Sequence, residues 1–200
     1  MKFIKENSYD IVKFFIYQLG IAIFSLTLAI PLRAAVEDAE TAGIVQLCVS
    51  ILSVAFYFML VYTVSWEHGA TDRIRIDAGR ATLDKFKGVK IALIACVPNM
   101  ILSLIAIVSS LLYADGNVWN TVLVTVHLIL GLIESMYLGA VQFVAKLVGN
   151  GSISDLVKSV CYFVFPFILV GAAHLGYTLG DKNFKIFGFI SNKTTKKAKK

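Results

Sequence analysis

The sequence has few charged residues, and its long apolar segments hold almost none of them. Asp, Glu, Lys and Arg make up 16% of the 200 residues, whereas a soluble domain contains roughly a quarter. Apolar residues make up 58%. This composition excludes an ordinary soluble fold and predicts an all-α, polytopic helical membrane bundle. Continuous apolar runs such as 44–64 also lack the alternation typical of strands in a membrane β-barrel.

Paired cysteines and the motifs of common catalytic sites are also lacking. Cys48, Cys96 and Cys161 lie far apart inside apolar runs. We therefore expect neither a disulfide framework nor a zinc site, and we interpret all three as buried free thiols. No HExxH, GxSxG or Walker glycine loop occurs. The sequence thus predicts no cofactor, no metal and no enzymatic activity, with an intramembrane enzyme as the least favoured alternative.

The apolar segments predict about five transmembrane helices. Most are close to the ~20 residues that cross a bilayer, and the fourth run is longer than a perpendicular span needs. The first could instead be a signal peptide, but its apolar run is long for one and Arg33 suits a cleavage site poorly. The expected spans are 14–32, 44–65, 91–113, 119–146 and 157–180.

One long polar segment, residues 66–90, separates the first two spans from the others. Its basic residues outnumber its acidic ones, and the positive-inside tendency therefore places it in the cytoplasm together with the N-terminus. Charge alternates with isoleucine from Asp72 to Asp77, which is compatible with a short strand. Leu83, Phe86 and Val89 recur every third residue, which suits either a short amphipathic helix in the membrane interface or a solvated loop.

The C-terminal tail conflicts with this threading. The formal net charge of +6 comes largely from lysines in residues 181–200. Five full crossings, which we expect, would place this tail outside, against the positive-inside tendency. A hairpin around Pro166 would instead leave it in the cytoplasm. Because no recognition motif accompanies the charge, it indicates topology and contact with anionic lipid, not binding of nucleic acid.

The fourth expected span carries a stripe of polar side chains. At 100° per residue, four of them fall on one face of a continuous helix. Small residues at Gly131, Ser135 and Gly139 would permit close contact with a neighbouring helix. The members of the stripe are Asn120, His127, Glu134 and Gln142.

Glu134 is the most informative member of the stripe, because an ionisable group at mid-span costs several kcal/mol unless it is paired, neutral or hydrated. One interpretation is a proton-relay or polar-substrate site, in which Glu134 titrates and His127 moves protons. The other is a structural clamp, in which protonated Glu134 bonds to Gln18, Asn99 or His174. His174, on the fifth span, is a second candidate site residue.

Two functions are therefore considered. The leading hypothesis is a non-catalytic subunit or accessory protein of the plasma membrane, which docks a protein partner through residues 66–90. The alternative is a small-solute or proton-coupled transport component that uses the polar stripe. The candidate residues for docking or lipid contact are Arg73, Arg75, Arg80, Lys85 and Lys87.

Overall fold

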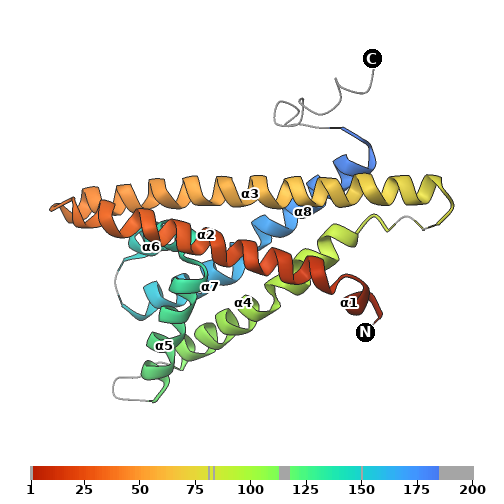
Figure 1. Cartoon of the computed structure of the whole chain (residues 1–200). Coiled ribbons are helices and arrows are strands. Elements are labelled where there is room, and N and C mark those ends of the chain that lie inside the picture. The colour runs from red at the N-terminus through yellow and green to blue at the C-terminus, as the bar shows by residue number, and fades with distance from the viewer. Residues whose placement is uncertain (1, 81, 83, 113–117, 150, 185–200) are drawn as a thin grey trace.

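The computed structural model describes residues 2–80, 82, 84–112, 118–149 and 151–184, and every regular element in these ranges is a helix (Figure 1). The prediction of an all-α fold is confirmed. Residues 185–200 of the tail expected at 181–200, and the end of the third expected span at 113, lie outside the described residues. After the short α1 (Lys2–Glu6), the continuous helices are α2 (Ser8–Ala34), α3 (Ala39–Asp77), α4 (Lys87–Leu111), and α7 (Ser152–Val164) joined to α8 (Phe167–Asp181).

Four candidates in the described chain are long and apolar enough to cross a membrane. These are α2, α3, α4 and the 29-residue stretch Ile153–Asp181, which continues through Pro166. The hairpin considered at Pro166 is therefore not formed. A fifth candidate consists of α5 (Val118–Ile133) and α6 (Leu138–Val148), which are joined by η1 (Ser135–Tyr137) and bent by 91°. The helices are compatible with a multi-pass membrane protein.

Helix α3, the longest element, lies antiparallel to α2 (Figure 1). At one end of the pair, Asp10 Oδ1 lies 3.1 Å from His68 Nε2. At the other end, Arg33 Nη1 donates a hydrogen bond to Gln46 Oε1 at 3.2 Å. The start of α2 therefore lies beside the end of α3.

Helix α8 runs parallel to α3, and glycines allow the two backbones to approach closely. A Cβ at Gly176 would lie 2.5 Å from the Tyr62 carbonyl oxygen, and one at Gly180 would overlap the Trp66 carbonyl. Small residues spaced four apart commonly permit such close contact between membrane helices. The end of α8 therefore lies at the same end of the bundle as the end of α3.

The helix α3 extends well into the segment expected to be a loop. It continues to Asp77, so the short strand considered from Asp72 to Asp77 is wrong. Ion pairs between Arg75 and Asp72 at 3.6 Å and between Arg73 and Asp77 at 3.1 Å have the i,i+3 and i,i+4 spacing that stabilises a helix. Beyond the C-cap at Ala78, Gly79 has a φ of +69°, and the amides of Gly79 and Arg80 bond back to the carbonyls of residues 76 and 75, which completes a Schellman motif.

No separate amphipathic helix precedes α4 in the described residues. Residues 84–86 form a turn in which Asp84 Oδ1 accepts a hydrogen bond from the Phe86 amide. Helix α4 begins at Lys87, and the Lys90 ammonium lies 5.6 Å from the centre of the Phe3 ring. The start of α4 is therefore beside the start of the chain, and α4 runs in the same direction as α2.

The long fourth apolar run is not one continuous helix, because it breaks at Glu134. Side chains of α2 and α3 bond to the backbone at the break, and the Ser135 side chain bonds to the backbone of α2. Ser135 Oγ donates to the Ala22 carbonyl at 2.6 Å, and Ser25 Oγ donates to the Ser135 carbonyl at 3.2 Å. The Gly139 amide donates to Ser50 Oγ at 2.8 Å. Irregular backbone inside an apolar bundle persists where such partners satisfy it.

Helix α5 begins at one end of the bundle, and α6 ends at that same end. Helix α5 follows the end of α4. Helix α6 packs against α3 at Gln46. Its Lys146 lines a cavity beside the turn between α2 and α3, which Asp38 also lines. The joined α7 and α8 then return the chain to the end where α2 begins. The described residues thus hold four continuous candidate spans, or five if the bent pair counts as one span.

Candidate functional site

Glu134 lies at the helix break, where its side chain is fully buried. Its exposed fraction is 0%, and neither carboxyl oxygen has a hydrogen-bond partner among the described residues. An unpaired carboxylate in an apolar interior costs far more free energy than the neutral acid. In this arrangement the side chain is therefore expected to hold its proton.

The neighbours of the Glu134 carboxyl come from four different elements and are neutral in their ordinary state. They are close enough to interact with it electrostatically. Phenol and thiol groups can donate a hydrogen bond, but they cannot compensate the charge of a carboxylate. These neighbours are Tyr57 of α3, Cys96 of α4, Tyr137 of η1 and Tyr162 of α7.

Other buried polar side chains of the bundle also have no partner in the part of the chain that the structure describes. Both polar atoms of the Asn99 amide are among them, although only 1% of this residue is exposed. Native interiors rarely leave such groups unpaired, and bound water or a ligand commonly satisfies them. The interior between α2, α3 and α4 thus offers unused hydrogen-bonding capacity. Among the other such groups are Gln18 Nε2, Ser53 Oγ, Tyr57 OH and Ser103 Oγ.

The polar stripe predicted on the fourth span is divided by the break. His127 Nε2 lies 2.9 Å from Ser159 Oγ, and that hydroxyl donates to the Asp155 carbonyl at 2.9 Å. His127 is therefore bonded to α7 and not to Glu134. Asn120 lies near the start of α5, where it is half-buried.

Gln142 lies beyond the break and faces a different cavity. This cavity has a volume of about 900 Å³ and lies between α6 and the turn that joins α2 to α3. Arg33, Glu40 and Lys146 also line it, so it carries charges of both signs. His127 thus lies about two helical turns before Glu134, whereas Gln142 lies beyond the break.

His174 lies outside the Glu134 site. Its ring stacks on Phe86, with centroids 6.0 Å apart and planes inclined by 9°, and it lines a cavity of about 330 Å³ with Tyr177. No hydrogen bond joins it to Glu134 in the described residues, and none joins Glu134 to Gln18 or Asn99. The predicted clamp is therefore not formed.

Three of the five predicted docking residues are ion-paired inside the protein. Lys87 Nζ lies 2.7 Å from Asp72 Oδ2, which also accepts a hydrogen bond from the Tyr177 hydroxyl at 3.0 Å. Arg75 pairs with the other oxygen of Asp72, and the Arg73 guanidinium lies 3.9 Å from Asp181 on α8. These contacts join α3, α4 and α8 at the charged end.

The other two predicted docking residues, Arg80 and Lys85, are exposed. Neither forms an ion pair with another described residue. Ile74 and Phe86 are exposed nearby in the sequence, at 72% and 60%. This end of the bundle therefore exposes both basic and large apolar side chains.

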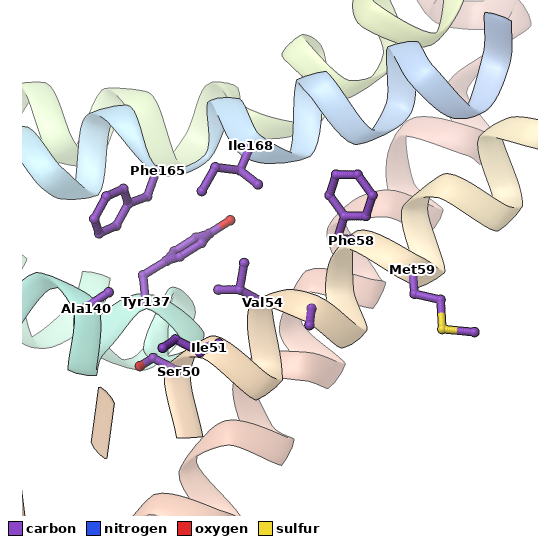
Figure 2. A pocket seen from close by; sticks show the side chains of 10 residues that line it. Ser50, Ile51, Val54, Phe58, Met59, Tyr137, Ala140, Phe165 and Ile168 are labelled. Atoms are coloured by element: carbon purple, nitrogen blue, oxygen red, sulfur yellow. The ribbon is translucent and has the colours of Figure 1, made fainter. Parts of the chain in front are cut away.

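An apolar groove lies beside the Glu134 site (Figure 2). Its volume is about 630 Å³, and it lies between residues 50–59 of α3 and the junction of α7 and α8. Figure 2 shows Tyr137 extending across it toward Ile168, between Phe165 and Val54, with the hydroxyl oxygen at its tip. Of the described residues that line it, Ser50 and Tyr137 alone carry a hydroxyl group.

The described residues contain no group of three or more His, Cys, Asp and Glu side chains that could hold a metal ion. No family model, curated protein or solved structure matches the chain. Function is therefore inferred from the residues and their geometry.

Sequence reasoning found Glu134 but missed the residues around it. Tyr57, Tyr137 and Tyr162 lie in apolar runs where an aromatic residue is ordinary, and no spacing links them. The length of the fourth apolar run was the one available signal that the helix is broken. The expectation that all three cysteines are buried is wrong for Cys48, which is exposed, since α3 turns it away from the core.

Proposed function

We propose that the protein is a multi-pass membrane protein that serves as a proton-coupled transport component for a small solute, with Glu134 as the proton-exchanging group. The observation that carries this proposal is a fully buried, unpaired carboxyl at a break between two helices. Broken helices form the binding sites of many membrane transporters, and intramembrane carboxyls commonly carry protons.

The protonation state of Glu134 is coupled to how closely α5 and α6 pack against α2 and α3. The neutral acid suits the closed interior, whereas the carboxylate requires water or a cation beside it. Loss of the proton therefore favours an arrangement in which α5 and α6 separate from α2 and α3 and admit water. The hydrogen bonds of Ser135, Ser25 and Ser50 are the contacts that this motion breaks.

We assign the N-terminus, the turn after α3 and the end of α8 to the cytoplasmic side. Arg80 and Lys85 lie in that turn, and positive charge near short loops favours the cytoplasm. Because the α5–α6 pair begins and ends at the opposite end of the bundle, the end of α8 then lies on the cytoplasmic side as well. This orientation removes the conflict that five full crossings create.

Access of water to position 134 tests the proposal. Cys48, Cys96 and Cys161 are replaced by Ser, and a single cysteine is placed at position 134. We expect a small charged thiol reagent to label it slowly in native membranes, since a transport cycle must open the site to water. Ala106→Cys, at a position 0% exposed in α4, is the buried control and should stay unlabelled. Arg80→Cys is the exposed control. A cysteine at 134 that remains as unreactive as the one at 106 contradicts the proposal.

Docking of a protein partner at the charged end is the second candidate function. It is favoured by the exposed side chains of Ile74, Arg80, Lys85 and Phe86. Reversing the charge of Arg80 and Lys85 should then remove copurifying partners, whereas the same change at Arg33, at the opposite end, should not. Unchanged copurification and localisation in the double variant would count against docking.

A further inference from the structure

The cavity of about 900 Å³ beside the turn between α2 and α3 carries two cations and two anions. The cations come from the last turns of α2 and α6, and the anions come from the start of α3. No ion pair joins any two of these four groups within the described chain. Each charge therefore remains available to a bound molecule. The four residues are Arg33, Lys146, Asp38 and Glu40.

A buried amide holds the Arg33 guanidinium at the wall of this cavity. Gln46, of which only 6% is exposed, also lines the cavity, and its Oε1 accepts a hydrogen bond from Arg33 Nη1 at 3.2 Å. A guanidinium has five N–H donors and can bind a carboxylate through two of them. Because the bond to Gln46 uses one donor, the guanidinium is held in place and keeps donors for a carboxylate ligand.

The acidic side of the cavity is formed by the first turn of α3. Asp38 Oδ2 accepts hydrogen bonds from the amide and the hydroxyl of Thr41, each 2.7 Å long, which hold its carboxylate in place. Glu40 lines the same cavity, and its carboxylate pairs with no cation of the described chain. Carboxylates bind an ammonium group through charge-assisted hydrogen bonds. The cavity therefore offers partners for a ligand cation as well as for a ligand anion.

We propose that this cavity binds a small zwitterion of the amino-acid type with an apolar side chain, and that this zwitterion is the solute of the proposed transport. Arg33 and Lys146 bind its carboxylate, and Asp38 and Glu40 bind its ammonium group. Because the two charges of each sign cancel, an ion of a single charge meets like charge as well as opposite charge here, whereas a zwitterion pairs with both.

The size and the apolar part of the cavity agree with this class of solute. A volume of about 900 Å³ lies within the ~300–1,000 Å³ of ordinary ligand pockets. Beside the charged groups, Ile44, Phe143 and Leu147 line the cavity. These side chains provide apolar surface that a hydrocarbon side chain of the solute can cover.

Helix α6 connects this cavity to the break at Glu134. Gly139 lines the cavity near the start of α6, and its amide donates to Ser50 Oγ of α3 at 2.8 Å. Loss of the Glu134 proton, which in the proposed function separates α6 from α3, therefore moves one wall of the cavity. As a transported solute the zwitterion rests on the proposed function, whereas its binding does not require Glu134 to exchange a proton.

Binding of radiolabelled L-leucine to the full chain tests the inference, in nanodiscs of phosphatidylglycerol, a lipid without an ammonium group. We expect saturable binding at neutral pH, with empty nanodiscs subtracted. L-Leucinamide lacks the carboxylate and N-acetyl-L-leucine lacks the ammonium group, so each should displace the label at least tenfold less effectively than unlabelled leucine. Absence of saturable leucine binding, or equal displacement by either analogue, overturns the inference.

Two pairs of variants locate the binding. Arg33→Gln should weaken leucine binding at least tenfold, whereas Arg80→Gln, the same change at the other end of the bundle, should not. Gly43→Trp and Gly20→Trp both place an indole at an exposed helical position where a Cβ meets no atom within 4 Å, but Gly43 lines the cavity. Gly43→Trp alone of these two should block binding. Leucine binding that is unchanged in Arg33→Gln or in Gly43→Trp overturns the assignment to this cavity.

A lipid headgroup could supply the same chemistry. Phosphatidylethanolamine carries an ammonium group and a phosphate, and we expect leucine binding to persist when this lipid is added to the nanodiscs. If the added lipid abolishes leucine binding, the cavity is a headgroup site and the assignment of a free solute is wrong.

The two proposals fail in different ways. If leucine does not bind but Glu134 still changes protonation with pH, the zwitterion inference is wrong and the proton-exchange function stands. If leucine binds but Glu134 shows no change of protonation, the cavity assignment stands and the proton-coupled function is wrong.

Discussion

Ser135 Oγ donates a hydrogen bond to the Ala22 carbonyl oxygen at 2.6 Å, across 113 residues of sequence. The bond fastens the broken turn after Glu134 to the middle of α2. Ser25 returns a hydrogen bond from α2 to the Ser135 carbonyl. The position of the buried carboxyl therefore depends on two serines that face each other across a helix contact.

Removal of the Ser135 hydroxyl should loosen the break. Ser135→Ala loses a buried hydrogen bond, and we expect a decrease of about 0.5–1.5 kcal/mol in the free energy of unfolding, measured by denaturation in detergent micelles. Ser109→Ala is the matched control, since that hydroxyl is equally buried but has no described partner. Equal losses in the two variants would show that the Ser135 bond does not stabilise the fold.

Two glycines of α8 should respond to alanine in opposite directions. A Cβ at Gly180 overlaps the Trp66 carbonyl, so α3 and α8 must separate, and we expect a loss of about 1–3 kcal/mol. A Cβ at Gly171 has no atom within 4 Å, and alanine there should stabilise the helix by about 0.5–1 kcal/mol. Thermal denaturation of both variants measures the difference. A stabilising Gly180→Ala would disprove the close α3–α8 contact.

The start of α3 should depend on pH through Asp38. Hydrogen bonds from the Thr41 hydroxyl and amide, each 2.7 Å long, hold the pKa of the Asp38 carboxyl below its ordinary value of 3.8. Because the folded pKa is the lower one, the stabilisation is present above pH 3.8 and is lost as the pH falls through the folded pKa. Asp38→Ala should therefore be less stable than the parent at neutral pH and no less stable in strong acid. Glu37→Ala, which removes no capping bond, should show no such dependence.

If the bent pair enters and leaves on one side of the membrane, Glu37 and Asn183 lie on opposite sides. In a background without the native cysteines, Glu37→Cys should react with a membrane-impermeant thiol reagent in intact cells. Asn183→Cys, just beyond α8, should react only after the cells are permeabilised. Rapid labelling at both positions in intact cells would mean that the chain crosses the membrane an odd number of times before Asn183.

The sequence predicted the helices whose signal is local. Apolar runs of suitable length mark α2, α4 and the α7–α8 stretch. The extension of α3 past Trp66 was not predicted, because its polar turns are stabilised by Asp72, Lys87 and Tyr177, which are brought together from three helices. Periodicity within one segment carries no information about such contacts.

The length of the fourth apolar run was consistent with a break, but no local pattern marked its position at Glu134. No proline or glycine stands at the bend, and the four polar residues of the stripe share one face only if the helix is continuous. The partners that satisfy the broken turn, Ser25 and Ser50, lie on α2 and α3 and look like ordinary small residues of a membrane helix. Glu134 could be selected from the sequence because the free-energy cost of burying a carboxyl follows from the residue type alone.

Infrared difference spectroscopy of the protonation of Glu134 tests the central claim most directly. Spectra of the protein in lipid films are recorded as the pH is raised and lowered reversibly. The account predicts a carboxylic-acid C=O band that disappears at high pH, returns at low pH, and is absent from Glu134→Gln. Glu67→Gln, at the charged end, should leave this band unchanged. A Glu134 band that persists over the whole range in which the protein stays folded would show a fixed structural acid and would contradict proton exchange at this site.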